Sequence, residues 1–130
     1  MVTRYLLDTN IVIYYTNDDL PENAAVLLDT EIEAGIYISV ISEIELLGFN
    51  APNPETLQTL QHFIDGSFII ELTRSINAKT IEIRKSKKIK LPDAVIAATA
   101  IVHDLTLISQ NDRDFRKIDG LKYFNPFTDL

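Results

Sequence analysis

The sequence predicts a three-layer α/β domain, in which a mostly parallel sheet of about five strands is flanked by helices on both faces. Short apolar, β-branched stretches alternate along the chain with helical patterns. Parallel strands need crossover connections, which the intervening helices would provide. The 130 residues are the usual size of one domain, and they contain no internal repeat or low-complexity segment. We therefore expect residues 1–130 to form a single domain.

Five segments have the apolar, β-branched character of strands, and the last is short enough to lie at an edge of the sheet. The predicted strands are residues 4–7, 35–41, 67–72, 105–109 and 121–124. The helical patterns between them cover residues 21–34, 42–47, 54–64, 75–87 and 92–103. Gly35 is expected to be the C-cap of the first of these helices.

Residues 11–15 (Ile-Val-Ile-Tyr-Tyr) allow two interpretations. They form either a helix or extended segment that packs on the sheet, or a surface for a partner protein. Together with the helix over residues 21–34, this segment would border an apolar groove that could receive an amphipathic helix of a partner.

Composition and charge limit the classes of function. The formal net charge is −7, and an acidic surface repels phosphate backbones unless basic residues gather in one place or metal ions intervene. The chain has no cysteine, which excludes disulfides and thiolate zinc sites and fits a reducing cytoplasm. The sequence has no signal-peptide pattern and no apolar run near the roughly 18 residues of a membrane span. We expect a cytoplasmic protein without a membrane anchor.

Four acidic groups are expected at the carboxyl edge of the sheet, where ligands bind in open parallel sheets. They are Asp8, Glu45, Asp93 and the segment Asn111-Asp112-Arg113-Asp114. Each group taken alone also fits a local role at a helix end or turn. These local roles are a cap by Asp8 or Asn10, a capping box of Ser42 and Glu45, a dipole contact of Asp93, and caps by Asp112 or Asp114 for a turn over residues 114–117.

Taken together, the acids indicate a metal site. Unpaired carboxylates that converge raise one another's pKa unless a cation neutralises them. Mg²⁺ and Mn²⁺ prefer oxygen ligands and are typically held by a few carboxylates together with substrate phosphates. The expected site is therefore that of a metal-assisted phosphodiesterase. His62 and His103 are expected to pack or to face helix dipoles instead of acting in the chemistry.

Four motifs follow one another along the chain: Leu7-Asp8-Thr9-Asn10, residues 38–42 running into Glu45-Leu46-Leu47, residues 91–100 around Pro92-Asp93, and residues 107–109 leading to Asn111-x-x-Asp114-Phe115. In order and spacing they resemble the motifs of PIN-domain ribonucleases, and especially those of the toxins of VapBC-type toxin–antitoxin pairs. The resemblance covers nearly the whole chain. It implies a PIN-like fold, a pocket that binds Mg²⁺ or Mn²⁺, and endonucleolytic cleavage of RNA.

The resemblance also implies roles for individual residues. Asp8, Glu45, Asp93 and Asp114 match the acids of the family as catalytic residues and metal ligands. Glu43 competes with Glu45, although Ser42 and Leu46 favour Glu45, and Asp112 competes with Asp114. The supporting residues are expected to be Thr9, Asn10, Ser42 and Asn111, of which Asn111 would orient a metal-bound water.

A basic run covers residues 84–90 and holds five of the 12 basic residues of the chain, immediately before Pro92-Asp93. It fits a solvated helix C-terminus, where cations meet the helix dipole favourably. It also fits a local guide for an RNA backbone beside the metal pocket, and both interpretations can hold. The candidate RNA-binding residues are Arg84, Lys85, Lys87, Lys88 and Lys90.

Other acid-based enzyme classes fit less well. A phosphatase of the haloacid-dehalogenase type needs a second acid two residues after the first, where this chain has Asn10. A receiver domain needs an acidic pair near the end of the first strand. The alternative that stays open is a catalytically silent PIN-like module that binds RNA or a protein. The expected function is that of a Mg²⁺- or Mn²⁺-dependent endoribonuclease toxin, with a cognate antitoxin as partner and a homodimer as its assembly.

Overall fold

A computed structural model describes residues 3–130 and contains a five-stranded, fully parallel sheet. The order of the strands is β3-β2-β1-β4-β5, so the short last strand lies at an edge, as predicted. The strands are β1 (Tyr5–Leu7), β2 (Tyr37–Ser39), β3 (Phe68–Ile70), β4 (Thr106–Ile108) and β5 (Lys122–Phe124). The order reverses between β1 and β4, and ligands of open parallel sheets bind at such a switch point.

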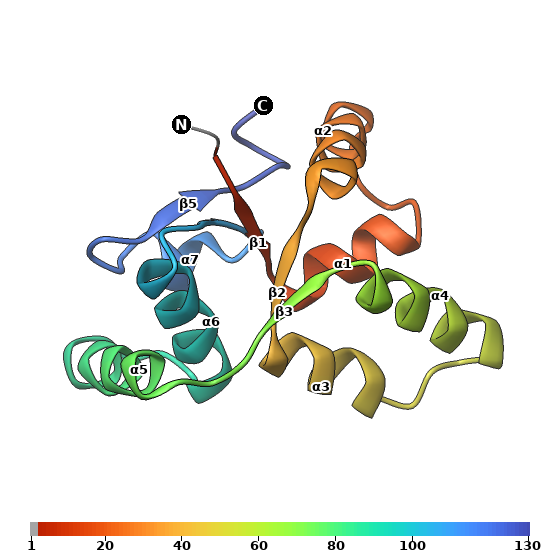
Figure 1. Cartoon of the computed structure of the whole chain (residues 1–130). Helices are drawn as coiled ribbons and strands as arrows, with labels where there is room; N and C mark the ends of the chain where they lie inside the picture. The colour runs from red at the N-terminus through yellow and green to blue at the C-terminus, as the bar shows by residue number, and fades with distance from the viewer. Residues whose placement is uncertain (1–2) are drawn as a thin grey trace.

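Seven helices cover the two faces of the sheet and confirm the predicted three-layer α/β fold. Figure 1 shows α1 to α4 on one side of the strands and α5 to α7 on the other. The helices are α1 (Thr9–Thr16), α2 (Glu22–Ala34), α3 (Val40–Gly48), α4 (Pro54–Asp65), α5 (Arg74–Ser86), α6 (Leu91–Val102) and α7 (Asp112–Phe115). In the described part of the chain, none of these helices has the length and apolar character needed to cross a membrane.

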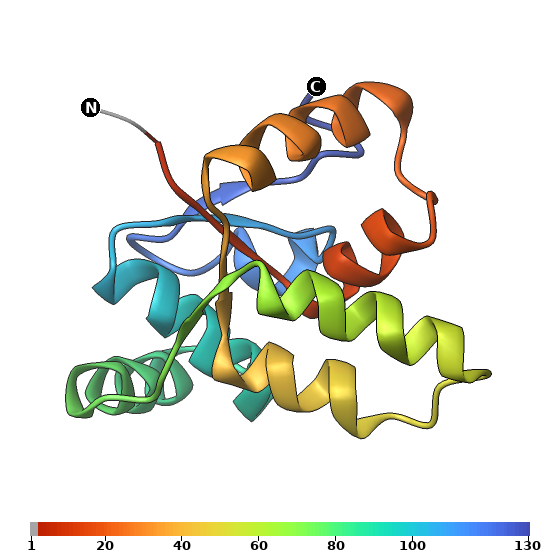
Figure 2. The same cartoon turned by 45° about the vertical axis from the view of Figure 1, so that its right-hand side comes forward.

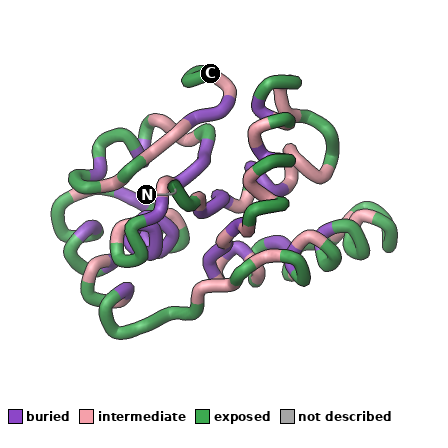
Figure 3. Tube along the Cα trace, turned by 45° about the horizontal axis from the view of Figure 1, so that its top comes forward, coloured by how far each residue is buried: buried purple, intermediate pink, exposed green. Residues whose placement is uncertain are grey.

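The core has two halves because side chains of a strand alternate between the faces of a sheet. Leu6 and Leu107 pack with α5 and α6, whereas Leu7 and Ile108 pack with α1 to α4. Helix α6 is buried at every position over residues 94–100, where four alanines allow close packing. Buried residues accordingly follow the middle of the molecule, and the outer faces of the helices are exposed (Figure 3).

Several boundaries differ from the predicted ones. Residues 9–16 form a helix in which Ile11 and Val12 are buried, so part of residues 11–15 packs on the sheet, while a partner surface on this segment stays a prediction. The predicted strand over residues 35–41 is shorter, because Gly35 ends α2 with a φ of 116° and the next helix already begins at Val40. The capping box of Ser42 and Glu45 is wrong: Ser39 is the N-cap of α3 and accepts a hydrogen bond from the Ile41 amide.

The last helical turn also differs from the prediction. It covers residues 112–115 instead of 114–117, and its N-cap is Asn111, not Asp112 or Asp114. The Asn111 side chain accepts from the amide of Asp114, which is the usual geometry of an asparagine cap.

Candidate active site

Asp8 lies where β1 ends and α1 begins, and both of its carboxylate oxygens are fixed. Oδ1 accepts from the amide of Thr9 at 2.9 Å, so Asp8 is indeed the N-cap of α1. Oδ2 accepts from the Ser109 hydroxyl at 2.8 Å. Ser109 follows β4, the neighbour of β1 across the switch point. The Asp8 carboxylate therefore serves both as the cap of α1 and as part of the candidate site, and Asp8 is only 8% exposed.

Glu45 is brought to this edge by α3 and is tied to the start of α1. Its Oε1 accepts from the Thr9 hydroxyl at 2.6 Å, and that hydroxyl also lies 2.9 Å from the hydroxyl of buried Ser42. Thr9 thus contacts Glu45 directly, and Ser42 contacts Thr9. In the described part of the chain, no hydrogen bond involves the Glu43 side chain, and Asn10 is exposed in the first turn of α1.

Asp93 and Asp114 complete the group from the other face of the sheet. Asp93 is in the first turn of α6, and Asp114 is buried in α7. The side-chain amide of Asn111 donates to Oδ2 of Asp114 at 3.0 Å. Oδ1 of Asp114 lies 3.6 Å from Nε of Arg113 and 3.8 Å from Nζ of Lys117.

The charges of these four acids act on one another. Burial raises the pKa of Asp8 to about 6, hydrogen bonds from Ser109 and Thr9 oppose the rise, and the charges of Asp93 and Glu45 add to it. Burial also raises the pKa of Asp93, with further increases from Asp114 and Glu45 and a decrease from Lys90. The edge therefore concentrates negative charge that its own cations leave partly uncompensated.

The donor chemistry of this edge fits Mg²⁺ or Mn²⁺. All four side chains offer carboxylate oxygens, which hard divalent cations prefer. Within residues 3–130, no three acidic or histidine side chains stand close enough to enclose an ion by themselves. Mg²⁺ does not require such a cage, because it usually keeps several waters and takes one or two carboxylates with substrate phosphates.

The side chain of Asp112 bonds with other residues than those that hold Asp8, Glu45 and Asp114. Its Oδ1 accepts from the Tyr123 hydroxyl at 2.7 Å and from the Asn125 side chain at 3.0 Å, and it lies 3.3 Å from Nε of Arg116. The hydrogen bonds from Tyr123 and Asn125 hold the pKa of Asp112 below its ordinary value, in contrast to Asp8 and Asp93.

The basic run approaches the acids only at its end. Arg84 and Lys85 lie in the last turn of α5, Lys87 is its C-cap, and Lys88 and Lys90 lie in the connection to α6. Lys90 is near enough to act on Asp93, and the backbone carbonyl of Lys88 accepts from Nζ of Lys117 at 3.3 Å.

Sequence reasoning missed Arg113 and Lys117 as cations of this edge. Arg113 directly precedes Asp114 in α7, and Lys117 follows Asp114 by three residues in the turn after α7, so both cations lie close to Asp114 along the chain.

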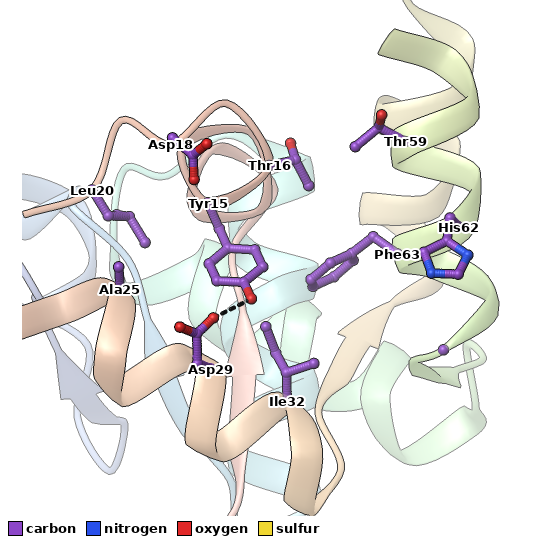
Figure 4. A pocket seen from close by; sticks show the side chains of 11 residues that line it. Tyr15, Thr16, Asp18, Leu20, Ala25, Asp29, Ile32, Thr59, His62 and Phe63 are labelled. Carbon is purple, nitrogen blue, oxygen red and sulfur yellow. Dashed lines mark hydrogen bonds between the residues drawn. The ribbon is translucent and has the colours of Figure 1, made fainter. Parts of the chain in front are cut away.

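A groove lies on the side of α1 to α4. Figure 2 shows α1 between α2 and α4. This groove has a volume of about 500 Å³ and is lined by all three helices. Figure 4 shows Tyr15 between Asp29 of α2 and Phe63 of α4, with its hydroxyl donating to Oδ1 of Asp29 at 2.5 Å. Ile32 and His62 also line the groove. The groove thus has the borders expected from residues 11–15 and 21–34, with α4 as an additional wall.

Three chains of solved complexes are similar to this one over 95% of its length. A chain of a toxin–antitoxin complex from Klebsiella pneumoniae has 31% identity and a TM-score of 0.74, and 98% of it is covered. A chain of VapBC2 from Rickettsia felis, bound to a promoter DNA fragment, has 26% identity, a TM-score of 0.82 and 98% coverage. A chain of FitAcB from Neisseria gonorrhoeae has 28% identity, a TM-score of 0.76 and 99% coverage.

No match is found among the curated proteins. The family model of the PIN domain matches residues 5–121, which is most of the chain and includes all four motifs. This match confirms the resemblance that those motifs carry. The chain belongs to the PIN-domain family.

Proposed function

We propose that this PIN-domain protein is a Mg²⁺- or Mn²⁺-dependent endoribonuclease and the toxin of a toxin–antitoxin pair. The observation that carries the proposal is the convergence of Asp8, Glu45, Asp93 and Asp114 on the switch point of the sheet. Burial, together with the charges of neighbouring acids, raises the pKa of Asp8 and Asp93, which supports a site whose charge a cation would neutralise.

The four acids are the residues that would hold the metal. A bound divalent ion lowers the pKa of an attacking water and stabilises the charge that develops on the phosphate. The neighbouring side chains fix the acids beforehand: Ser109 holds Asp8, Thr9 holds Glu45, and Asn111 holds Asp114. Because these side chains are already oriented, they do not have to reorganise when substrate binds.

RNA is the substrate that the family resemblance implies, and the cations suit it. In a chain with a net charge of −7, a phosphate backbone needs a local basic path. Lys88 and Lys90, continued by Lys117 and Arg113, border the acids on the α6 and α7 side. Arg84, Lys85 and Lys87 would extend this path away from the acids for a longer RNA.

The proposed antitoxin segment is an amphipathic helix that binds in the groove between α1, α2 and α4. Apolar anchors would fill the space around Ile32 and Phe63, and aromatic or aliphatic anchors in pockets supply most of the affinity of such interfaces. A basic side chain beside these anchors would reach the carboxylates and compete with metal. Chains similar to this one occur in toxin–antitoxin complexes, which supports a cognate partner. We also propose a homodimer that acts in the cytoplasm.

The nuclease proposal is tested by incubating purified protein with total RNA, with Mg²⁺, with Mn²⁺ and with chelator, and by mapping the cut ends. We expect cleavage at discrete positions with either metal and none with chelator. Binding of RNA without any cleavage would instead support the catalytically silent module. Cleavage that persists in chelator would contradict the metal site.

The toxin proposal has a separate test in cells. Expression of the protein alone is expected to slow growth, and co-expression of the product of the neighbouring small open reading frame is expected to restore it. Normal growth with abundant folded protein would argue against a toxin. If that same preparation cleaved RNA in vitro, the protein would be a highly selective or housekeeping nuclease.

A further inference from the structure

The last residues of the chain are bonded to the segment that carries Asn111 and Asp114. We call residues 123–129 the C-terminal strap. The Tyr123 hydroxyl lies 2.7 Å from Oδ1 of Asp112 and 3.0 Å from the carbonyl oxygen of Ser109. One hydroxyl thus bridges the end of β4 and the start of α7. Asn125, which is buried, adds a second bond to Asp112.

The strap is itself fixed in place. An Nη of Arg116 lies 2.9 Å from each carboxylate oxygen of Asp129, and the guanidinium sits 4.9 Å from the centre of the Tyr123 ring. Asp129 also accepts from the amide of Asn125 at 2.8 Å. At the other side, Phe127 packs edge-on against Tyr14 of α1, with ring centres 5.5 Å apart. The strap therefore contacts both helices that begin at the acidic edge beside β1 and β4.

The residues that the strap contacts are linked by hydrogen bonds or by the chain to two of the acids, Asp8 and Asp114. Ser109, whose carbonyl faces Tyr123, holds Asp8 with its hydroxyl and accepts from the amide of Asn111. Asp112 follows Asn111, which holds Asp114. Helix α7 has only four residues and is too short to be stable by itself, so its direction depends on tertiary contacts. Tyr123, Asn125 and Asp129 all lie beyond residues 5–121, the part that matches the PIN-domain model.

We propose that the C-terminal strap positions the metal ligands, and that Asp112 is the residue through which it acts. Asp112 is then a positioning residue and not a ligand, while Asp114, two residues further on, is the ligand. Tyr123 and Asn125 fix Asp112, and this sets the directions in which Asn111 presents Asp114 and Ser109 presents Asp8. The inference rests on the proposed metal site of this protein.

The test measures the affinity of the purified full chain for Mn²⁺ without RNA, by calorimetry or by electron paramagnetic resonance. Tyr123→Phe removes only the hydroxyl and keeps the ring that contacts Arg116. Residues that orient metal ligands typically change metal affinity or activity by about 10- to 100-fold. We expect Tyr123→Phe to weaken Mn²⁺ binding by at least about tenfold, while the melting temperature in chelator changes little. Tyr37→Phe is the matched control, because it removes a hydroxyl at the opposite end of the parallel strands.

A double-variant cycle separates positioning from ligation. If the strap acts through Asp112, Tyr123→Phe and Asp112→Asn weaken Mn²⁺ binding to a similar degree and are not additive together. If Asp112 is itself a ligand, Asp112→Asn resembles Asp114→Asn and Tyr123→Phe has no effect, which overturns the inference. Equal Mn²⁺ affinity of wild type and Tyr123→Phe overturns it as well and leaves the proposed function intact. A wild-type protein that binds no Mn²⁺ overturns the proposed metal site and this inference with it.

Discussion

The acidic edge and the groove differ in kind, although α1 contributes to both. At the start of α1, the carboxylates of Asp8, Glu45 and Asp114 are held by hydrogen bonds from Ser109, Thr9 and Asn111. At the end of α1, the groove combines apolar and aromatic side chains, such as Leu20, Ile32 and Phe63, with polar ones around the Tyr15–Asp29 pair, namely Thr16, Asp18, Thr59 and His62. Chemistry on a phosphate requires fixed positions, whereas recognition of a helix requires apolar area.

The acidic edge and the groove lie at opposite ends of the same short helix. Helix α1 has eight residues, which corresponds to about 12 Å at 1.5 Å per residue. A partner helix anchored at Tyr15 that continues for about two turns toward the start of α1 would therefore bring a basic side chain to the acids. The comparison predicts that variants at one end of α1 affect cleavage and variants at the other end affect only inhibition.

The largest effect is expected from Asp8→Asn or Asp93→Asn. Each removes a metal charge at the edge and keeps the volume of the side chain, so the fold should survive. We expect RNA cleavage in Mg²⁺ to fall by more than about 100-fold, beyond the range for residues that merely orient ligands. Binding of the antitoxin in the groove should persist. Asp19→Asn, at an exposed loop, is the control and should cleave normally. Cleavage at the wild-type rate by either site variant would falsify the carboxylate site.

The next effect separates two acids of the same helix. Glu45 and Glu43 point about 200° apart around α3, so only one can face the acidic edge. Glu45 accepts from Thr9 and acts on Asp8 and Asp93. We expect Glu45→Gln to lower the rate of RNA cleavage by about 10- to 100-fold. Glu43→Gln should change it less than about twofold, because in the described residues the Glu43 side chain, which is half-buried, makes no hydrogen bond. The reverse ranking would move the ligand to Glu43 and break the alignment with the family.

The sequence predicts the layers, the five strands and the four acidic groups, because hydrophobic period and chain order carry that information locally. The prediction from sequence fails at the start of α3, which it places at Ser42 instead of Val40. Val40 and Ile41 have strand propensity, and Ser42 with Glu45 fits a capping box, so the pattern favours a longer strand. Packing overrides this preference: Ser39 caps the helix, and Ser42 becomes a buried partner of Thr9.

The bonds from Thr9 to Glu45 and from Ser109 to Asp8 are long-range and have no local signature. The first joins residues 36 apart, and the second joins residues 101 apart. The different roles of Asp112 and Asp114 likewise depend on Tyr123 and Asn125. Two acids of one turn, two residues apart, look equivalent in sequence, and only the partners that the fold brings to each distinguish them.

The third prediction concerns a variant that disrupts the groove and leaves the acidic edge unchanged. Ile32→Asp places a charge among the apolar side chains of the groove. Loss of a well-packed anchor costs about 2 kcal/mol or more, so we expect the affinity for the antitoxin to fall by at least about 30-fold. RNA cleavage by the purified variant should be unchanged, and co-expressed antitoxin should no longer restore growth. Val26→Asp is the control on the same helix, because Val26 is exposed and outside the groove. Full rescue of growth with Ile32→Asp would remove the groove as the docking site.

The smallest effect concerns the stability of the metal-free protein. Burial raises the pKa of Asp8 to about 6, and a carboxyl in the unfolded chain titrates near about 3.9. Between these values the folded state binds more protons than the unfolded state, so the free energy of unfolding falls as pH rises from about 4 to about 6. Asp8→Asn removes this decline. Above pH 6 the variant is expected to be more stable than wild type in chelator.

The net gain in stability should be modest. A rise of about two in the pKa of one group corresponds to about 3 kcal/mol. The side chain of asparagine, however, accepts a weaker hydrogen bond from Ser109 than a carboxylate does. We expect a difference of about 1 kcal/mol, or a few degrees in melting temperature. Urea unfolding of both proteins between pH 4 and 8 measures it, and the difference between them cancels the titration of the other acids. Asp29→Asn, whose carboxylate lies in the groove, should show no such gain. If wild type and Asp8→Asn kept a constant difference across this range, the raised pKa that burial gives Asp8 would be contradicted.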